Sequence, residues 1–92
     1  MALHYALERH SSSHLRDQWI EQLTTTLREL HEAGVVWGDT KAENVLIDRE
    51  DNAWIIDFGG GHTRGWVDEK LANTVEGDRQ GLSRIVTHIL SK

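Results

Sequence analysis

The spacing of the apolar residues changes abruptly at Gly34, and this change limits the folds that the chain can adopt. Before Gly34 the apolar positions follow at intervals of 4, 1, 3, 4 and 3 residues, which trace one helix face: Leu15, Trp19, Ile20, Leu23, Leu27 and Leu30. This spacing predicts a helix over residues 14–32. Gly34 then supplies the left-handed backbone conformation that commonly ends a helix.

Beyond Gly34 the apolar residues come in short runs that are typical of β-strands. Residues 45–47 and 53–56 flank a polar turn and predict a β-hairpin, and residues 35–37 form another β-prone run. The two hairpin runs are apolar throughout, so we expect both faces of each strand to be covered. Three tryptophans follow the apolar pattern and are expected in the core: Trp19, Trp37 and Trp54.

Helical spacing returns near the end of the sequence. Apolar residues stand at i, i+3, i+4, i+7 and i+8, and they predict a helix that begins between Thr74 and Asp78: Leu82, Ile85, Val86, Ile89 and Leu90. Residues 60–74 show no period and are expected to form a loop. The pattern predicts an α+β fold, with a polar lead-in over residues 1–13 and a single domain over residues 14–92.

Length and composition exclude several classes of protein. Ninety-two residues suffice for one domain, and a net charge of −5 argues against a nucleic-acid binder. The chain has no cysteine, so it forms neither a disulfide scaffold nor a thiolate zinc site. Its longest apolar runs have three or four residues, too few to cross a membrane. The sequence shows no secretory signal, and we expect an intracellular, cytoplasmic protein.

Two short motifs carry the residue types that phosphoryl transfer requires. Asp39, Lys41 and Asn44 share one polar loop, and Asp57 follows the second hairpin run as Asp-Phe-Gly. A carboxylate can orient an attacking hydroxyl and accept its proton. A lysine can neutralise charge on the moving phosphoryl group, and a carboxylate with an amide oxygen can hold Mg²⁺.

Each of these residues is ordinary when taken alone. An aspartate after a strand is most often a turn residue, and a lone lysine is most often a solvated surface residue. The whole pattern has a chance frequency on the order of 10⁻⁵ for this length, which favours the functional interpretation. His31, by contrast, lies near a predicted helix end and is expected to be structural.

The two motifs resemble the C-terminal lobe of eukaryotic protein kinases. Residues 37–44 are similar to the catalytic loop, and residues 57–59 are similar to the metal-binding Asp-Phe-Gly motif. The resemblance implies that Asp39 is the catalytic base and that Lys41 contacts the γ-phosphate of ATP, as a catalytic and a cofactor-binding residue. It implies also that Asn44 and Asp57 bind Mg²⁺ and, through it, the nucleotide.

The resemblance extends to the flanking helices and implies a partial kinase C-lobe. The predicted helices correspond to αE and αF, with the catalytic loop, a small hairpin and an activation-segment-like loop between them. Asp78 matches the αF residue that braces the catalytic-loop backbone. Trp37 and Gly38 replace the usual His and Arg, so control by activation-loop phosphorylation is not expected. The pattern is closest to a divergent, fungal-type branch of kinase-like proteins.

Other parts of a kinase domain are missing from the sequence. It contains neither a Gly-x-Gly-x-x-Gly loop after a strand nor a strand lysine, so we expect that the N-lobe is absent. Completed by such a lobe, the chain would transfer the ATP γ-phosphate to a Ser/Thr hydroxyl of a protein, with weak or no activity alone. The alternatives are a non-catalytic kinase-like interaction module and a fragment of a small-molecule phosphotransferase of the aminoglycoside or choline kinase type.

The expected partners follow from this interpretation. They are ATP, a protein substrate and a chain that supplies the missing lobe, with no nucleic acid and no membrane. The apolar stripe of the second helix would lack its usual covering, and exposed apolar patches favour association. We therefore also expect marginal stability of the monomer or self-association.

Overall fold

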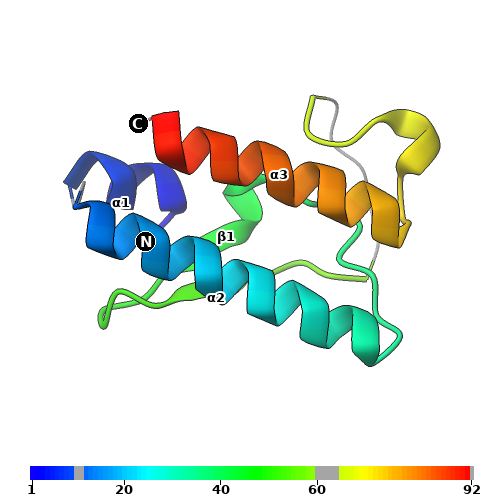
Figure 1. Cartoon of the computed structure of the whole chain (residues 1–92), viewed down its shortest axis with the longest axis horizontal. Helices are drawn as coiled ribbons and strands as arrows, with labels where there is room; N and C mark the ends of the chain where they lie inside the picture. Colours follow the sequence, from blue (N-terminus) through cyan, green and yellow to red (C-terminus); the bar gives the residue numbers. More distant parts are fainter. Residues whose placement is uncertain (10–11, 60–64, 92) are drawn as a thin grey trace.

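The computed structural model describes residues 1–9, 12–59 and 65–91. Over these residues the chain is an α+β fold with three α-helices, α1 (Leu3–Arg9), α2 (Ser13–Glu32) and α3 (Val75–Ser91). The strands β1 (Val45–Ile47) and β2 (Ala53–Ile55) form a two-stranded sheet. The chain also contains two short 3₁₀ turns, η1 (Ala42–Asn44) and η2 (Glu69–Leu71). The long helices α2 and α3 run side by side in opposite directions, and the hairpin lies behind α2 (Figure 1).

Helix α2 confirms the predicted helix to within one residue. The Ser12 hydroxyl caps its start by accepting a hydrogen bond from the Leu15 N–H (3.3 Å). At its end Gly34 has φ 79°, and the N–H of Val35 donates to the carbonyl of Leu30 (2.8 Å). This is the glycine termination that the sequence predicts, and it reverses the chain toward α3.

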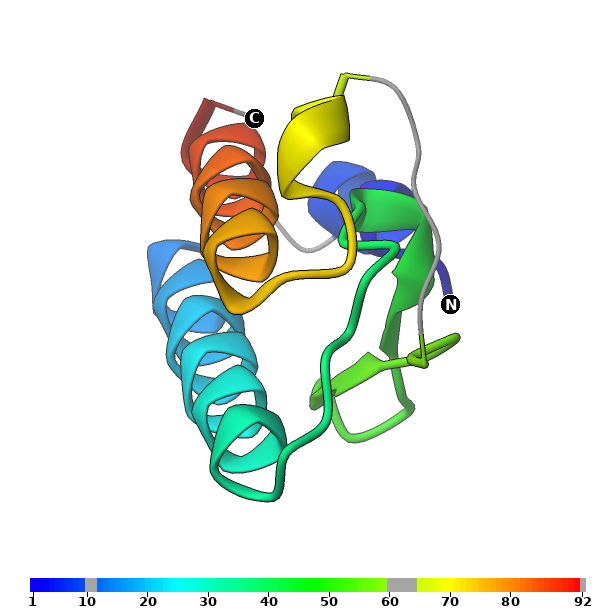
Figure 2. The same cartoon turned by 90° about the vertical axis from the view of Figure 1, so that its right-hand side faces the viewer.

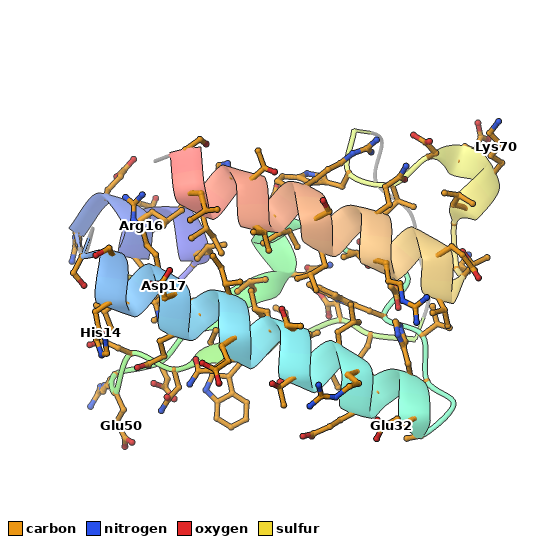
Figure 3. The ribbon with its side chains drawn as sticks, in the orientation of Figure 1. His14, Arg16, Asp17, Glu32, Glu50 and Lys70 are labelled. Atoms are coloured by element: carbon orange, nitrogen blue, oxygen red, sulfur yellow. The ribbon has the colours of Figure 1, made fainter. Side chains whose placement is uncertain are left out.

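Helix α3 begins at Val75, inside the predicted range, and buries Ile85 and Ile89 against the core. Arg16 extends from α2 to the C-terminal end of α3 (Figure 3), where its Nη1 donates to the carbonyl of Ile89 (3.0 Å). A cation at this position interacts favourably with the helix dipole. The side chain is about nine-tenths buried, and its Nε has no hydrogen-bond partner among the described residues.

The hairpin is confirmed, but the prediction that both of its faces are covered is wrong. Val45 pairs with Ile55 and Ile47 with Ala53, and these residues are buried. Successive residues of a strand point to opposite faces, so Leu46 and Trp54 face outward. Trp54 is 58% exposed, and its Nε1 donates to Asp48 Oδ2 (2.7 Å), so its predicted place in the core is wrong as well.

Residues 35–37 are not a strand, contrary to the expectation from their composition. The main-chain N–H groups of Trp37 and Gly38 donate to the Asp78 carboxylate rather than to a neighbouring strand. The side chain of Trp37 is fully buried, as is that of Trp19, which confirms the core prediction for both tryptophans.

Residues 1–9 of the polar lead-in pack against the remainder of the chain. Helix α1 buries Leu3, Ala6 and Leu7 in the same hydrophobic core as α2 and α3. The N-terminal amine donates to the carbonyl of Ile47 (2.9 Å), and the N–H of Ile47 donates back to the carbonyl of Met1 (2.7 Å). Residues 10–11 of the lead-in, and residues 60–64 of the predicted activation-segment-like loop, lie outside the described residues. Among the described residues, no helix is long and apolar enough to cross a membrane.

Candidate active site

Asp78, in the first turn of α3, is the anchor of the polar loop that precedes β1. It is about 1% exposed. Its Oδ1 accepts from the N–H of Gly38 and from the Thr40 hydroxyl (both 2.8 Å), and its Oδ2 accepts from the N–H of Trp37 (2.8 Å). The expectation that Asp78 braces this backbone is therefore confirmed. Hydrogen bonds to a charged group each contribute about 1.5–3 kcal/mol, so the carboxylate holds both sides of Asp39 firmly.

His31, near the end of α2, supplies a fourth contact to the same carboxylate. Its Nε2 lies 2.7 Å from Asp78 Oδ2. An ionised carboxylate only accepts hydrogen bonds, so Nε2 carries the proton in this contact. From the sequence, His31 is expected only to be structural, near a helix end. The sequence gives little indication of this contact, because no local pattern links His31 to a carboxylate 47 positions later.

Close packing of α3 on the loop depends on Gly81. A Cβ atom built at Gly81 would lie 2.5 Å from Cγ2 of Thr40, well inside van der Waals contact. On the loop side, Gly38 has φ 84°, a conformation that favours glycine. The two glycines let helix and loop approach closely enough for Asp78 to reach three loop residues.

Asp39 and Lys41 lie next to each other in the braced loop. Lys41 Nζ is 3.5 Å from Asp39 Oδ2, and the two side chains are 23% and 22% exposed. Both charged groups therefore remain accessible from solvent while their backbone is held. The structure brings together these two predicted site residues.

Asn44 joins the same cluster and links it to the second hairpin strand. Its side chain is about 5% exposed, and its Nδ2 donates to the main-chain carbonyl of Asp39 (2.9 Å). The main-chain carbonyl of Asn44 accepts from the N–H of Ile56 (3.0 Å), and the carbonyl of Ile56 accepts from Trp37 Nε1 (3.0 Å). Ile56, the residue just before Asp57, is thus hydrogen-bonded to the loop through both its N–H and its C=O.

Asp57 itself is exposed and has φ 55°. The left-handed conformation is uncommon for residues other than glycine, though aspartate adopts it more readily than most. The N–H of Gly59 donates to the carbonyl of Val36 (3.3 Å), so hydrogen bonds hold the backbone on each side of Asp57. The structure places Asp57 on a segment bonded directly to the loop that carries Asp39, Lys41 and Asn44.

The donor set is suited to a hard divalent cation. Because Asn44 Nδ2 is engaged with the Asp39 carbonyl, the amide oxygen is the atom of that side chain left for a ligand. An amide oxygen and an exposed carboxylate are oxygen ligands of the kind that Mg²⁺ takes, while it keeps several waters. Within the described residues, no group of three or more His, Cys, Asp or Glu side chains could hold a metal on its own.

The sequence is similar to those of known protein kinases. The sequence profile described as "Protein kinase domain" matches residues 2–80. The chain is 44% identical over 55 residues to the human hormonally up-regulated neu tumor-associated kinase, covering 60% of this chain and 8% of that protein. It is 51% identical over 41 residues to a probable serine/threonine-protein kinase of Dictyostelium discoideum, covering 44% of this chain and 8% of that protein.

A serine/threonine-protein kinase of Eremothecium gossypii is 45% identical over 47 residues, which cover 51% of this chain and 6% of that protein. The matched region thus spans less than a tenth of the length of each of these relatives. No solved structure matches the chain significantly.

Proposed function

The chain belongs to the protein kinase domain family, and we propose that it carries the catalytic loop and the metal-binding segment of an ATP-dependent phosphotransferase. The observation that supports this most strongly is the pair of hydrogen-bond systems around Asp39. Asp78 holds the residues on either side of it, and Asn44 bonds to its carbonyl. A catalytic carboxylate needs such positioning, because proton transfer requires hydrogen-bond distance to the reacting hydroxyl.

In the proposed reaction, Asp39 orients the attacking hydroxyl and accepts its proton. The hydroxyl oxygen forms a bond to the γ-phosphorus of ATP, the bond from that phosphorus to the β–γ bridging oxygen breaks, and ADP leaves. Lys41, whose Nζ lies 3.5 Å from Asp39 Oδ2, keeps a positive charge beside the moving phosphoryl group.

Asn44 and Asp57 would hold Mg²⁺, which when bound neutralises charge on the nucleotide phosphates. The acceptor that we propose is a Ser/Thr hydroxyl of a protein, since two of the similar proteins are described as serine/threonine-protein kinases. That description favours a protein acceptor over the small-molecule acceptors of aminoglycoside or choline kinases. We further propose that transfer needs a polypeptide that covers the nucleotide, and that the chain alone is inactive or very weak.

A thermal-shift titration with Mg²⁺ and ATP tests the proposed nucleotide site. A ligand that binds only the folded chain at about 100 times its Kd adds about 2.7 kcal/mol to the free energy of unfolding. For a domain of this size we expect a rise of about 10–20 °C in the unfolding midpoint. Asp57→Ala should abolish the magnesium-dependent part of this rise. Asp17→Ala is the matched control, because Asp17 is an exposed carboxylate on α2.

A clear unfolding transition without any magnesium-dependent rise would contradict the proposal for the isolated chain. That result would favour the second interpretation, a kinase-like interaction module without catalytic function.

A further inference from the structure

A groove of about 850 Å³ opens between α2 and β2, and its lining extends to Phe58, the residue after Asp57. One wall is the face of α2 that carries Glu21, Thr25 and Glu29, and the other wall is β2 with the residues that follow it. The helix and the hairpin form opposite sides of the lower half of the molecule (Figure 2). None of the four proposed site residues lines this groove.

The edge of β2 that faces this groove carries unused main-chain groups. Hydrogen bonds between the strands involve the even-numbered residues, as in Asp48 with Asn52 and Asn44 with Ile56. Residues alternate in an antiparallel ladder, so the N–H and C=O groups of Ala53 and Ile55 point to the opposite edge. Ile47 follows the same rule on β1, where its outward groups bond to Met1.

Helix α2 covers only one end of this edge. Gln22 Oε1 accepts from the N–H of Ala53 (2.8 Å), and Gln22 Nε2 donates to Asn52 Oδ1 (2.7 Å). Among the described residues, we find no partner for the main-chain groups of Ile55. The helix therefore covers the edge near Ala53, whereas the main-chain groups of Ile55, a residue that is 7% exposed, face the part of the groove that Glu29 and Phe58 also line.

Large apolar side chains border the open end. Trp54 is 58% exposed and Phe58 is 54% exposed, and both line the groove. An unpaired strand edge is a template for an added strand. Main-chain hydrogen bonds then give affinity, and alternate side chains give specificity.

The charge of the groove selects the kind of segment that fits. Glu21 and Glu29 line it, and its lining contains no lysine or arginine. Neither glutamate forms an ion pair with a described residue. A basic segment would therefore be attracted by both carboxylates, whereas an acidic segment would be repelled.

We propose that this groove binds an extended, basic segment of a partner polypeptide, which adds to β2 as a third strand. The incoming strand pairs with the N–H and C=O of Ile55, sets apolar side chains against Trp54 and Phe58, and directs lysine or arginine toward Glu21 and Glu29. A second copy fits less well. Pairing β2 with its symmetry mate would bring the acidic walls together on chains that each carry a net charge of −5.

This interface goes beyond the proposed phosphotransfer and does not depend on it, because it uses none of the residues assigned to the nucleotide. The test is a ¹H–¹⁵N NMR titration of the whole chain, without nucleotide, using a short peptide that alternates lysine and valine. We expect shifts at Ile55, at the Trp54 indole and at Phe58, with the braced loop unchanged. Shifts spread over the surface, or confined to other faces, would refute the interface.

Two peptide controls separate strand addition from simple attraction. The same peptide with glutamate in place of lysine should bind at least about 10-fold more weakly, and equal binding of the two would refute the charge argument. A version N-methylated at alternate residues keeps the charge but cannot donate on the pairing edge. Loss of the hydrogen bond that the peptide donates to the Ile55 carbonyl should weaken its binding at least about 2-fold, and unchanged affinity would refute strand addition.

A pair of double variants tests the walls of the groove. Glu21→Gln with Glu29→Gln should weaken the lysine–valine peptide about 2- to 10-fold, with a smaller effect in high salt. Glu8→Gln with Glu69→Gln removes the same charge from exposed positions elsewhere and should leave affinity nearly unchanged. Equal losses in the two double variants would contradict the proposal. Shifts at Ile55 that depend on protein concentration without peptide would assign the groove to a second copy instead.

Discussion

Replacement of Asp78 should destabilise the fold more than replacement of any exposed acidic residue. Its carboxylate accepts four hydrogen bonds, from the N–H of Trp37, the N–H of Gly38, the Thr40 hydroxyl and His31 Nε2. Asp78→Ala leaves these donors unsatisfied in a buried site. Donors that lose a charged partner cost about 1–3 kcal/mol each, but neighbouring losses are not additive, so we expect about 3–5 kcal/mol in total.

That loss is large against the stability expected for a chain of this size. At about 0.05–0.15 kcal/mol per residue, 92 residues give roughly 5–14 kcal/mol. Asp78→Asn should cost less, about 2–3 kcal/mol. The amide keeps one acceptor oxygen, but it turns an N–H₂ group toward donors that need an acceptor.

Urea unfolding followed by tryptophan fluorescence measures these differences, because Trp19 and Trp37 are fully buried in the folded chain. Asp17→Asn, an exposed carboxylate on α2, is the control and should shift the free energy of unfolding by no more than about 0.5 kcal/mol. If Asp78→Ala lay within about 1 kcal/mol of the parent chain, the carboxylate would not be the anchor that its contacts indicate.

Three further predictions concern packing, a buried charge and pH. Gly81→Ala places a methyl group 2.5 Å from Thr40 Cγ2, so thermal unfolding should show that the free energy of unfolding falls by about 1–3 kcal/mol. An unchanged free energy of unfolding would mean that α3 can move away from the loop. Arg16→Met keeps the buried aliphatic part of the side chain and removes a guanidinium group whose Nε has no partner among the described residues. Urea unfolding should therefore show that the free energy of unfolding changes by no more than about 1 kcal/mol. The N–H of Asn52 and the Trp54 indole donate to Asp48 and lower the pKa of its carboxyl below the usual 3.8. Because the pKa of Asp48 is lower in the folded chain, its ionised carboxylate stabilises the hairpin above pH 3.8, and this stabilisation is lost as the pH falls through the lowered pKa. Trp54 fluorescence should report this loss of stability at low pH, and Asp48→Asn should abolish the pH dependence.

The long periodic segments were predictable from the sequence because helical spacing repeats over several turns. Helix α2 begins one residue before its predicted start, and α3 begins within the predicted range. Their ends follow from local chemistry, the Ser12 cap and the Gly34 turn, which act within a few residues.

The short segments were less predictable because three residues carry too little pattern. The runs that contain Leu46 and Trp54 are apolar throughout, so composition alone could not reveal that one face of the sheet is at the surface. Residues 35–37 have strand-like composition, yet the N–H of Trp37 donates to Asp78, 41 positions away. A contact over that distance is a tertiary effect that local propensity does not contain.

The candidate site was predicted mainly through its motifs. The spacing of Asp39, Lys41 and Asn44 marks the loop, and the structure brings these residues together. Neither the contact of His31 with Asp78 nor the open edge of β2 could be read from the sequence. Both depend on how α2 packs on the remainder of the chain.

The most direct test of the central proposal asks whether Asn44 and Asp57 form one metal site with nucleotide bound. Mn²⁺ replaces Mg²⁺ as a paramagnetic probe in the presence of ATP, and NMR records which signals broaden first. We expect broadening to begin at the Asn44 side-chain amide and at the backbone of Asp57, and Asp57→Ala should remove it from Asn44. Broadening centred on the acidic turn at residues 48–51, or unchanged at Asn44 in Asp57→Ala, would refute the proposed metal site.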